Sequence, residues 1–401
     1  MSSFPLVNIL NLTSLLGIGI GLYTGTIPMY VSETASARRR GQLVLVEGVF
    51  ALSGLAVAAW VNFGMYYTSG SVSWRFTISL QLVLLLILVA LTPFLPESPR
   101  WLVKKEKMDE ATSIMARLMD RSVDDPEVAK EIAVIHAAMT RATDHGNKYS
   151  TNPFALNQNR HLYRSLLAIT ATMFLQLTGI SAIAFYSVSI FEETLGYSGA
   201  SARALSASLQ VTLALGGLTA VFCVDRFGRR PLMLFSLSSM VVCQAAVAGL
   251  TSDQGNIPAS RAAVFFYFLA NYTLAVGMFM MPFMYGAEVA PLGIRHKITA
   301  MGAASCWLFN FMVAEVTPTA FANIKWRYNI VYAAISVASC VMVFLFFPET
   351  RGRSLEEIDE IFLQSKSIFD PVRVANKLPV GIDLLETIQG EKEEANDPQV
   401  A

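Results

Sequence analysis

Nine long apolar segments constrain this chain more than any other feature of its sequence. Each has at least about 20 residues, the length that an α-helix needs to cross the hydrocarbon core of a bilayer. In chain order they cover 12–31, 42–62, 76–95, 162–190, 205–224, 231–250, 262–287, 299–321 and 328–347. Only helices and closed barrels satisfy every backbone polar group inside lipid. The segments therefore predict an all-α membrane protein with about nine membrane-spanning helices.

The composition agrees with this prediction. Only 15% of the residues are charged and 54% are hydrophobic, whereas about a quarter of the residues in a soluble domain are charged. This balance excludes an ordinary soluble enzyme. The 30 basic and 30 acidic residues cancel, so the chain lacks the basic excess that indicates a nucleic-acid partner.

The cysteines and histidines indicate no disulfide framework, metal site or cofactor. All four cysteines lie within apolar segments, unlike those of a secreted disulfide scaffold: Cys223, Cys243, Cys306 and Cys340. The histidines have no ligand spacing to a cysteine or to one another. No Gly-x-x-x-x-Gly-Lys pattern points to ATP. We therefore expect neither an enzyme nor an ATP-driven pump.

Basic residues fall in alternate loops between the segments. They occupy 38–40, 100–164, 226–230, 295–297 and the tail from Arg351, while the intervening loops are poor in Lys and Arg apart from Lys325 and Arg327. Cytoplasmic loops carry the excess of Lys and Arg. We therefore expect the chain to enter its first span from outside and to end with its C-terminus in the cytoplasm.

The loop before residue 162 and the tail carry short helical patterns. Apolar residues recur at helical spacing in two sets, namely Ala111, Ile114, Met115 and Leu118, and then Ile132, Ile135 and Ala138. Residues 355–361 predict one more short helix. The acidic end from Glu391 is expected to be disordered.

The chain contains an internal repeat. Glu33 is followed by Arg40 after seven residues, and Glu288 is followed by Arg295 at the same spacing, 255 positions later. The motif from Pro96 recurs from Pro348, 252 positions later. A copy of the fourth to sixth segments would precede residue 1. The repeat therefore predicts a six-helix unit duplicated to twelve, with the first three helices absent from this chain.

At these residues the chain resembles the sugar porter family of the major facilitator superfamily, and phrases such as Trp307-Leu308-Phe309-Asn310-Phe311 are most similar to fungal members. The motifs are Gly21, Gly25, Pro28, Tyr30, Glu33 and Arg40-Gly41, then Pro96-Glu97-Ser98-Pro99-Arg100, Asp225-Arg226-Phe227-Gly228-Arg229-Arg230, Glu288 with Arg295, and Pro348-Glu349-Thr350-Arg351-Gly352. The resemblance implies a major facilitator fold that transports a sugar or related polyol by alternating access. Transport is either facilitated or proton-coupled, and the plasma membrane is the expected location.

The resemblance also implies four parts. A partial N-terminal bundle covers 1–98, corresponding to the family's helices 4–6, and a cytoplasmic helical loop covers 99–161. A six-helix bundle covers 162–347, and a cytoplasmic tail covers 348–401.

Charged residues at the inner helix ends are expected to form an intracellular gate, a role that the resemblance implies. They are Glu33, Arg40, Asp225, Arg229, Arg230, Glu288 and Arg295. Such charges can link helices when the inner side is shut, and the links must break when it opens. The alternative is that the positive charges only set topology.

Polar and aromatic residues within the spans are the candidates for substrate binding, because polar side chains inside a membrane are costly and face a cavity or a partner. In the fourth segment they are Gln176, Ser181 and Tyr186, and the resemblance adds Phe283, Trp307 and Asn310 because they match site positions of the family. The family's amide motif Q-Q-x-x-G-x-N reads here with Leu175 and Ser181 in place of its first Gln and its Asn. Phe283 replaces a tryptophan, and Gly48 replaces a glutamine. The alternatives are an interhelical hydrogen bond for Gln176 and Asn310 and core packing for Phe283 and Trp307.

Glu47 and Glu315 are the only acids well inside the segments. A buried carboxyl group is readily protonated. Glu47 is therefore a candidate proton site, and the alternative is a structural acid with a partner. The expected partners are a sugar or polyol, a proton and the lipid bilayer.

Two other functions remain open on the same scaffold. One is a sugar sensor that does not transport, and the other is a truncated product that cannot transport. The loss of three helices would remove one wall of the central pathway.

Overall fold

The computed structural model describes residues 4–35, 40–144, 152–157, 159–253 and 256–381. Within these ranges the regular structure is entirely helical, which confirms the all-α prediction. Nine stretches of the described chain are long and apolar enough to cross a membrane: Thr13–Val31, Gly41–Met65, Val72–Phe94, His161–Thr194, Gly199–Phe227, Arg229–Leu250, Ile257–Val289, Arg295–Ile324 and Arg327–Phe346. They match the nine apolar segments.

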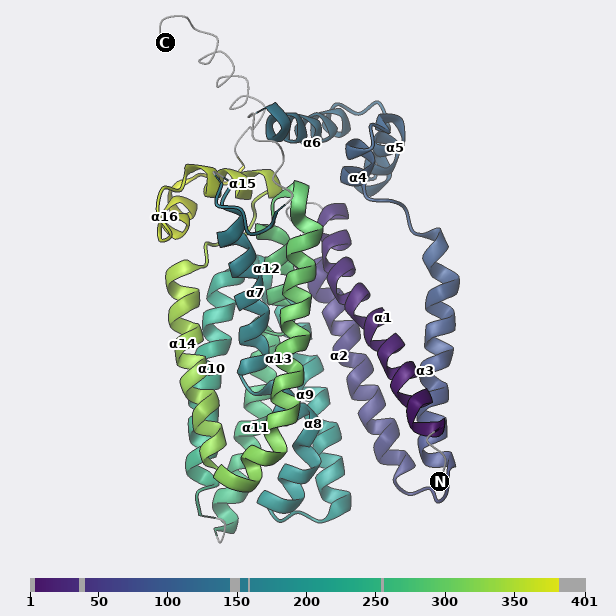
Figure 1. Cartoon of the computed structure of the whole chain (residues 1–401), viewed down its shortest axis with the longest axis vertical. Helices are drawn as coiled ribbons and strands as arrows, with labels where there is room; N and C mark the ends of the chain where they lie inside the picture. The colour runs from purple at the N-terminus through teal and green to yellow at the C-terminus, as the bar shows by residue number, and fades with distance from the viewer. Residues whose placement is uncertain (1–3, 36–39, 145–151, 158, 254–255, 382–401) are drawn as a thin grey trace, which may run out of the picture.

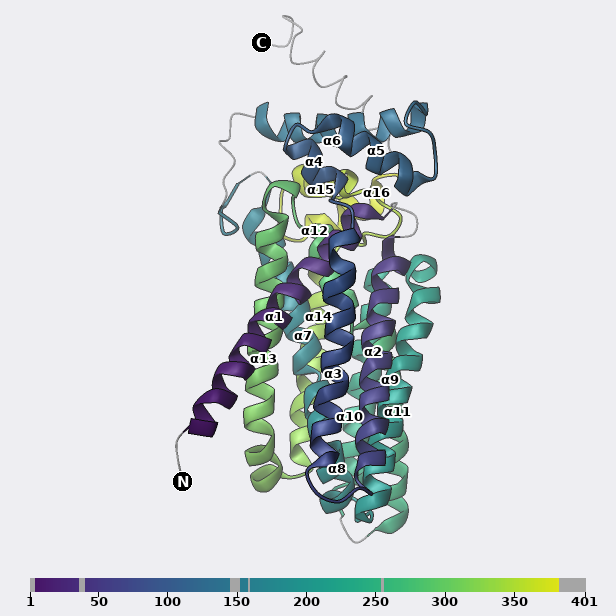
Figure 2. The same ribbon diagram turned by 90° about the vertical axis from the view of Figure 1, so that its right-hand side faces the viewer.

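The N-terminal helices are α1 (Phe4–Thr34), α2 (Arg40–Met65) and α3 (Val72–Leu91), followed by the short turn η1 (Thr92–Phe94). They pack loosely on one another, and α1 is tilted relative to α2 and α3 (Figures 1 and 2). No residue of α3 is buried. The rest of the protein holds α1 and α2, because α2 lies along α9 and α1 lies against α13, whereas α3 contacts α2.

Three short helices form a separate layer at one end of the molecule (Figure 2). They are α4 (Pro99–Lys104), α5 (Met108–Met119) and α6 (Pro126–Asp144), and they enclose a small core that includes Ala111, Met115, Ile132 and Ile135. This confirms the two amphipathic helices predicted in the loop. Leu118 points away from that core and is 42% exposed, and the side chain of Ala138 lies outside the described part of the chain.

The C-terminal bundle contains eight helices: α7 (His161–Leu177), α8 (Ile180–Ser189), α9 (Gly199–Phe227), α10 (Arg229–Leu250), α11 (Ile257–Gly277), α12 (Met281–Val289), α13 (Arg295–Ile324) and α14 (Arg327–Phe346). A π-helical turn, η2 (Ile190–Thr194), extends α8, and η3 (Leu292–Ile294) precedes α13.

Two of the nine predicted spans consist of two helices each, a break that the sequence analysis did not predict. The segment 162–190 breaks at Gly179, which has φ +89°. A Cβ atom on Gly179 would lie 2.8 Å from the ring of Tyr332, so α14 approaches too closely for a larger residue. The segment 262–287 breaks at 278–280, between α11 and α12.

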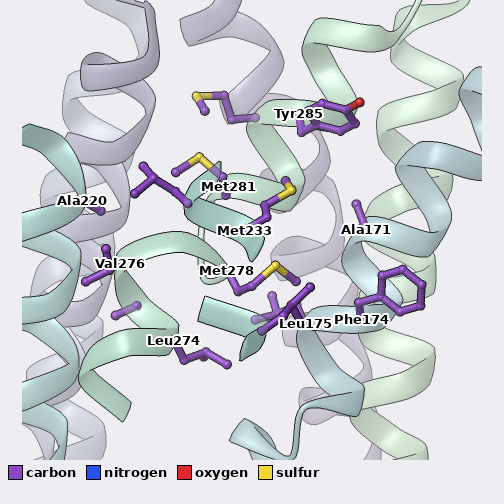
Figure 3. Packing of buried hydrophobic residues seen from close by; sticks show 14 of the residues in the cluster. Ala171, Phe174, Leu175, Ala220, Met233, Leu274, Val276, Met278, Met281 and Tyr285 are labelled. Atoms are coloured by element: carbon purple, nitrogen blue, oxygen red, sulfur yellow. The ribbon is translucent and has the colours of Figure 1, made fainter. Parts of the chain in front are cut away.

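The main hydrophobic core lies within this bundle. Figure 3 shows Leu175 of α7 beside Met278, which lies in the break between α11 and α12, and Met233 of α10 and Met281 of α12 belong to the same core. Methionine side chains are flexible and fill irregular gaps. Methionines at and beside the break between α11 and α12 therefore belong to the core.

The tail folds back under the bundle as α15 (Leu355–Gln364) and α16 (Asp370–Lys377), at the same end as α4–α6 (Figure 1). The predicted helix 355–361 is confirmed as part of α15, whereas α16 was missed. Ser354 and Glu357 form a capping box at the start of α15. Arg353 donates hydrogen bonds to the carbonyls of Ala375 and Leu378, both at 2.7 Å, and so holds α16 in place. The region from Glu391 lies outside the described residues.

Candidate substrate site and gate

The break between α7 and α8 carries a polar cluster. Asn310 of α13 donates through Nδ2 to Gln176 Oε1 at 3.2 Å and to Ser181 Oγ at 2.9 Å. Ser181 Oγ also donates to Gln176 Oε1. Three of the predicted binding residues are therefore brought into contact from two segments of the chain.

The helix break creates this cluster. Gly179 ends α7 in a left-handed conformation that favours glycine, and Gln244 of α10 donates to the freed carbonyl of Thr178 at 3.2 Å. Ser181 thereby lies against the last turn of α7. Gln176 also donates to Cys306 Sγ at 3.0 Å, so its amide joins α7 to α13, as the alternative interpretation for Gln176 and Asn310 expected.

The cluster combines donors and acceptors in a nearly dry environment. Gln176 is 7% exposed and Ser181 is 4% exposed, while Asn310 is half-buried. Amide groups both donate and accept hydrogen bonds. The cluster can therefore replace its internal hydrogen bonds with hydrogen bonds to the hydroxyl groups of a ligand. No buried polar atom is then left without a partner.

The three predicted aromatic residues lie in other environments. Phe283 lines a small cavity of about 10 Å³ together with Thr24 and Pro28 of α1 and Thr172 of α7. That volume is about that of one water molecule. Trp307 is 41% exposed and donates to Thr24 Oγ1 at 3.2 Å. Tyr186 donates to the carbonyl of Ala314 at 2.9 Å.

The two acids predicted to be buried differ. Glu47 is half-buried, and its Oε2 has no hydrogen-bond partner among the described residues. Glu315 is exposed, so the expectation of burial was wrong for it, because that face of α13 is not covered. Beside Glu47, a Cβ atom on Gly48 would lie 2.1 Å from Met280 Cγ. The methionine occupies the space that a glutamine at position 48 would need.

One ion cluster lies inside the C-terminal bundle, at the end that carries α4–α6 and α15. The Arg229 guanidinium lies 3.0 Å from Glu288 Oε1 and 3.0 Å from Asp225 Oδ1. Thr350 donates to Glu288 Oε2 at 2.6 Å. Arg229 and Glu288 are each 1% exposed, so this cluster joins α9, α10 and α12 in a dry environment.

A second ion cluster joins the two halves at the same end. Arg295 of α13 lies 3.3 Å from Glu33 Oε1 of α1. Ser98 donates to Glu33 Oε2 at 2.7 Å, and Arg100 donates to the Glu33 carbonyl at 3.1 Å. Arg100 also forms an ion pair with Glu356 of α15 at 2.9 Å. Burial by itself lowers the pKa of Arg100, but the carboxylates of Glu356, Glu33 and Glu131 together raise it above its ordinary value.

The start of α2 rests directly on the first cluster. A Cβ atom on Gly41 would lie 2.5 Å from Asp225 Oδ1 and 2.7 Å from Arg229 Nη2. Glycine is therefore required for this approach. Asp225 Oδ2 is buried and has no partner within the described part of the chain. The side chain of Arg40, predicted for the gate, lies outside the described side chains.

Arg230 has a different environment from its neighbour. Its side chain donates to the carbonyl of Phe344 at 2.6 Å, and its backbone N–H donates to Glu349 Oε2 at 3.0 Å. The backbone N–H of Arg229 donates to Glu349 Oε1 at 3.0 Å. Gly228, at φ +99°, allows the Glu349 carboxylate to approach this turn.

Sequence reasoning did not identify several residues that form contacts at this end of the molecule. Arg164, 1% exposed, donates to the carbonyl of Val289 and forms an ion pair with Asp359. Its position as an arginine inside the apolar segment 162–190 could have identified Arg164. Arg100 and Glu349 stand in the repeated motifs, which was a signal for them, whereas nothing in the sequence indicates that Glu356 meets Arg100.

Comparison with known proteins identifies the family. The profile described as "Sugar (and other) transporter" matches residues 9–362. The chain belongs to this family. The Sugar transporter STL1 of Saccharomyces cerevisiae is 34% identical over 365 residues, which cover 90% of this chain and 64% of STL1. The MFS-type transporter oryC of Aspergillus oryzae is 32% identical over 387 residues, which cover 94% of this chain and 72% of oryC.

A solved structure shares the fold of this sugar transporter family member. The proton:xylose symporter XylE, bound to 6-bromo-6-deoxy-D-glucose, superposes with a TM-score of 0.76 at 23% identity, over 86% of this chain and 72% of that chain. The predicted major facilitator fold and the resemblance to fungal sugar porters are thus confirmed. The protein is a multi-pass membrane protein whose relatives are transporters and not enzymes. The chain spans 64% of the length of STL1.

Proposed function

We propose that this protein moves a sugar or related polyol across the plasma membrane by alternating access, with its C-terminus in the cytoplasm. The observation that carries the proposal is the cluster of Gln176, Ser181 and Asn310 at the break between α7 and α8. The similarity to the Sugar transporter STL1 supports a sugar as the class of substrate. We further propose the division into parts at 1–98, 99–161, 162–347 and 348–401.

In this proposal the amides bind substrate hydroxyls, with Tyr186, Phe283 and Trp307 as apolar walls. The cavity beside Phe283 measures only about 10 Å³, whereas small-molecule pockets measure about 300–1,000 Å³. Substrate entry therefore requires α1 to move away from α12 and α13. That movement breaks the bond between Trp307 and Thr24.

The gate lies at the end that carries α4–α6 and the tail helices. Opening this end separates Glu33 from Arg295 and lifts Gly41 off Asp225 and Arg229. The pair of Arg229 and Glu288 lies within one bundle, so it stays intact during a rigid-body movement. Arg40 and Arg230 complete the proposed gate from the start of α2 and of α10.

Glu47 is the proposed proton site. Its half-buried carboxylate has an oxygen without a hydrogen-bond partner among the described groups. Protonation removes the cost of keeping a charge at that depth, so a proton can be taken up on one side of the membrane and released on the other. Facilitated transport is the alternative mechanism.

The test is uptake of labelled glucose, xylose and sorbitol by this chain in cells that lack their own sugar carriers. We expect uptake of at least one compound and a loss of about tenfold or more in Gln176→Ala. Gln81→Ala, which changes an exposed glutamine of the membrane helix α3, is the matched control and should transport normally. A correctly inserted protein that takes up no sugar or polyol would refute the proposal, and binding without uptake would favour a sensor.

A further inference from the structure

A groove of about 730 Å³ lies where α7 begins, at the end of the molecule that carries α15 and α16. It is far larger than the cavity beside Phe283 and does not include the polar cluster of the proposed substrate site. Three segments line it: the loop before α7, the first turns of α7, and the segment after α15. The lining includes Leu156, Arg160, Leu162, Leu166, Leu363 and Ile368.

The groove has exposed apolar residues both inside and outside the membrane-spanning helices. Leu156 is 90% exposed, Ile368 is 52% exposed and Leu166 is 46% exposed. Exposure of Leu166 is ordinary for a lipid-facing helix, but Leu156 lies before α7 and Ile368 lies after α15, outside the spans. The groove therefore has an apolar surface that an occupant would cover.

The groove opens toward the lipid-facing side of the bundle. Tyr163 donates to the Phe346 carbonyl of α14 at 2.7 Å, and Ser305 of α13 donates to the Ile169 carbonyl at 3.1 Å. Leu166 lies between these two contacts along α7, so its exposed side chain faces outward between α13 and α14. Figure 1 shows α7 running between those helices. An apolar chain that starts in the groove can continue along α7 into the membrane.

A cation lies at the other end of the groove. The Arg160 guanidinium donates to the Ser365 carbonyl through Nε at 3.1 Å and through Nη2 at 2.6 Å, and to the Ser367 carbonyl through Nη1 at 2.8 Å. These neutral acceptors use three of its five N–H groups. The charge is not neutralised by an ion pair with any described carboxylate.

Two acids of the tail helices, Asp359 and Asp370, have other partners. Asp359 forms its ion pair with Arg164. Asp370 accepts through Oδ2 from the backbone N–H groups of Lys366 at 3.1 Å and Ser367 at 2.6 Å. An anionic ligand can therefore bind two remaining N–H donors of Arg160, whose guanidinium has no ion pair with a described carboxylate.

We propose that this groove binds an anionic phospholipid, with the headgroup phosphate at Arg160 and one acyl chain along Leu162 and Leu166. A soluble phosphate would use the arginine but leave the apolar walls uncovered. A zwitterionic lipid would cover the walls but gain less from the charge. Anionic lipids are concentrated in the cytoplasmic leaflet, which is the side proposed here for this end. The bound lipid joins the start of α7 to the tail, because Arg160 also holds the backbone at Ser365 and Ser367.

The test is native mass spectrometry of the delipidated full-length chain in detergent, titrated with phosphatidylserine, phosphatidylcholine or sodium phosphate. One arginine near a membrane surface corresponds to about a fivefold preference for an anionic lipid, so we expect phosphatidylserine to bind about fivefold more tightly than phosphatidylcholine. Arg160→Gln should abolish this preference. Leu166→Trp should weaken both lipids, because the larger side chain fills the groove.

Two further variants control the experiment. Arg117→Gln removes the same charge from an exposed position on α5 and should keep the preference. Arg160→Lys keeps the charge and should keep most of the preference, which provides a reading if Arg160→Gln fails to fold. Equal binding of the two lipids to the parent, an equal loss in Arg117→Gln, unchanged lipid binding in Leu166→Trp, or displacement of the lipid by millimolar phosphate would overturn the proposal.

Discussion

Glu33 and Glu288 occupy equivalent places in the internal repeat, yet the structure predicts opposite results when each is changed to glutamine. Glu288 is 1% exposed and accepts bonds from Arg229 and Thr350 within one bundle. Removing one charge of a buried pair costs about 3–5 kcal/mol. Glu288→Gln should therefore lower the thermal stability of the whole protein strongly.

Glu33 is 12% exposed and links the halves through Arg295. A hydrogen bond to a charged group contributes about 1.5–3 kcal/mol, so its loss should shift the equilibrium toward the open inner side by about 10- to 150-fold. Thermal stability should fall less than in Glu288→Gln, because the other contacts of α1 and α2 remain.

The assay for gate opening is the rate at which a membrane-permeant maleimide labels Cys306, which is 3% exposed and bonded to Gln176. Peptide mass spectrometry gives this rate separately from that of Cys243, a buried control within the same bundle at 1% exposure. Glu33→Gln should raise the Cys306 rate while leaving Cys243 protected. Labelling of Cys306 at the parental rate in Glu33→Gln, or equal losses of stability in the two variants, would refute the reasoning. Glu33 would then not link the halves while Glu288 stabilises one bundle.

Three further predictions concern the helix breaks and the intramembrane acid. Gly48→Gln should destabilise the protein by about 1–3 kcal/mol through overpacking, and Met280→Ala in the same chain should restore the melting temperature, since Met280 occupies that space. Gly179→Ala should be more destabilising than Gly70→Ala in thermal melts, because both have positive φ but only the first meets a ring; equal effects would contradict this. Uptake that increases as the pH falls should lose that dependence in Glu47→Gln, and an unchanged pH profile would exclude Glu47 as the proton site.

The number of spans and the helices of the loop were predictable from local composition. Hydrophobicity over about 20 residues decides whether a segment belongs in lipid, and that property does not depend on the neighbouring helices. The same reasoning missed the breaks at Gly179 and at 278–280. Each of these segments is apolar throughout, and the breaks depend on the approach of other helices.

The candidate site was also predictable from the sequence only in part. The cost of polar groups in lipid indicated Gln176 and Ser181, the family resemblance indicated Asn310, and the structure brings the three together. Phe283, Trp307 and Tyr186 were proposed for the same pocket, and the structure shows contacts of their own with α1, α7 and α13. Their positions follow from helix packing, which hydropathy does not encode.

The sequence by itself determined that this chain has nine apolar segments of membrane-spanning length, a repeated pair of charged motifs and charges at the helix ends, because these properties depend on composition and spacing along the chain. Only the tertiary structure decided that Glu288 pairs within a bundle while its repeat Glu33 pairs across the halves. An ion pair depends on the distance between helices that lie far apart in the chain, and two identical motifs can therefore have different partners.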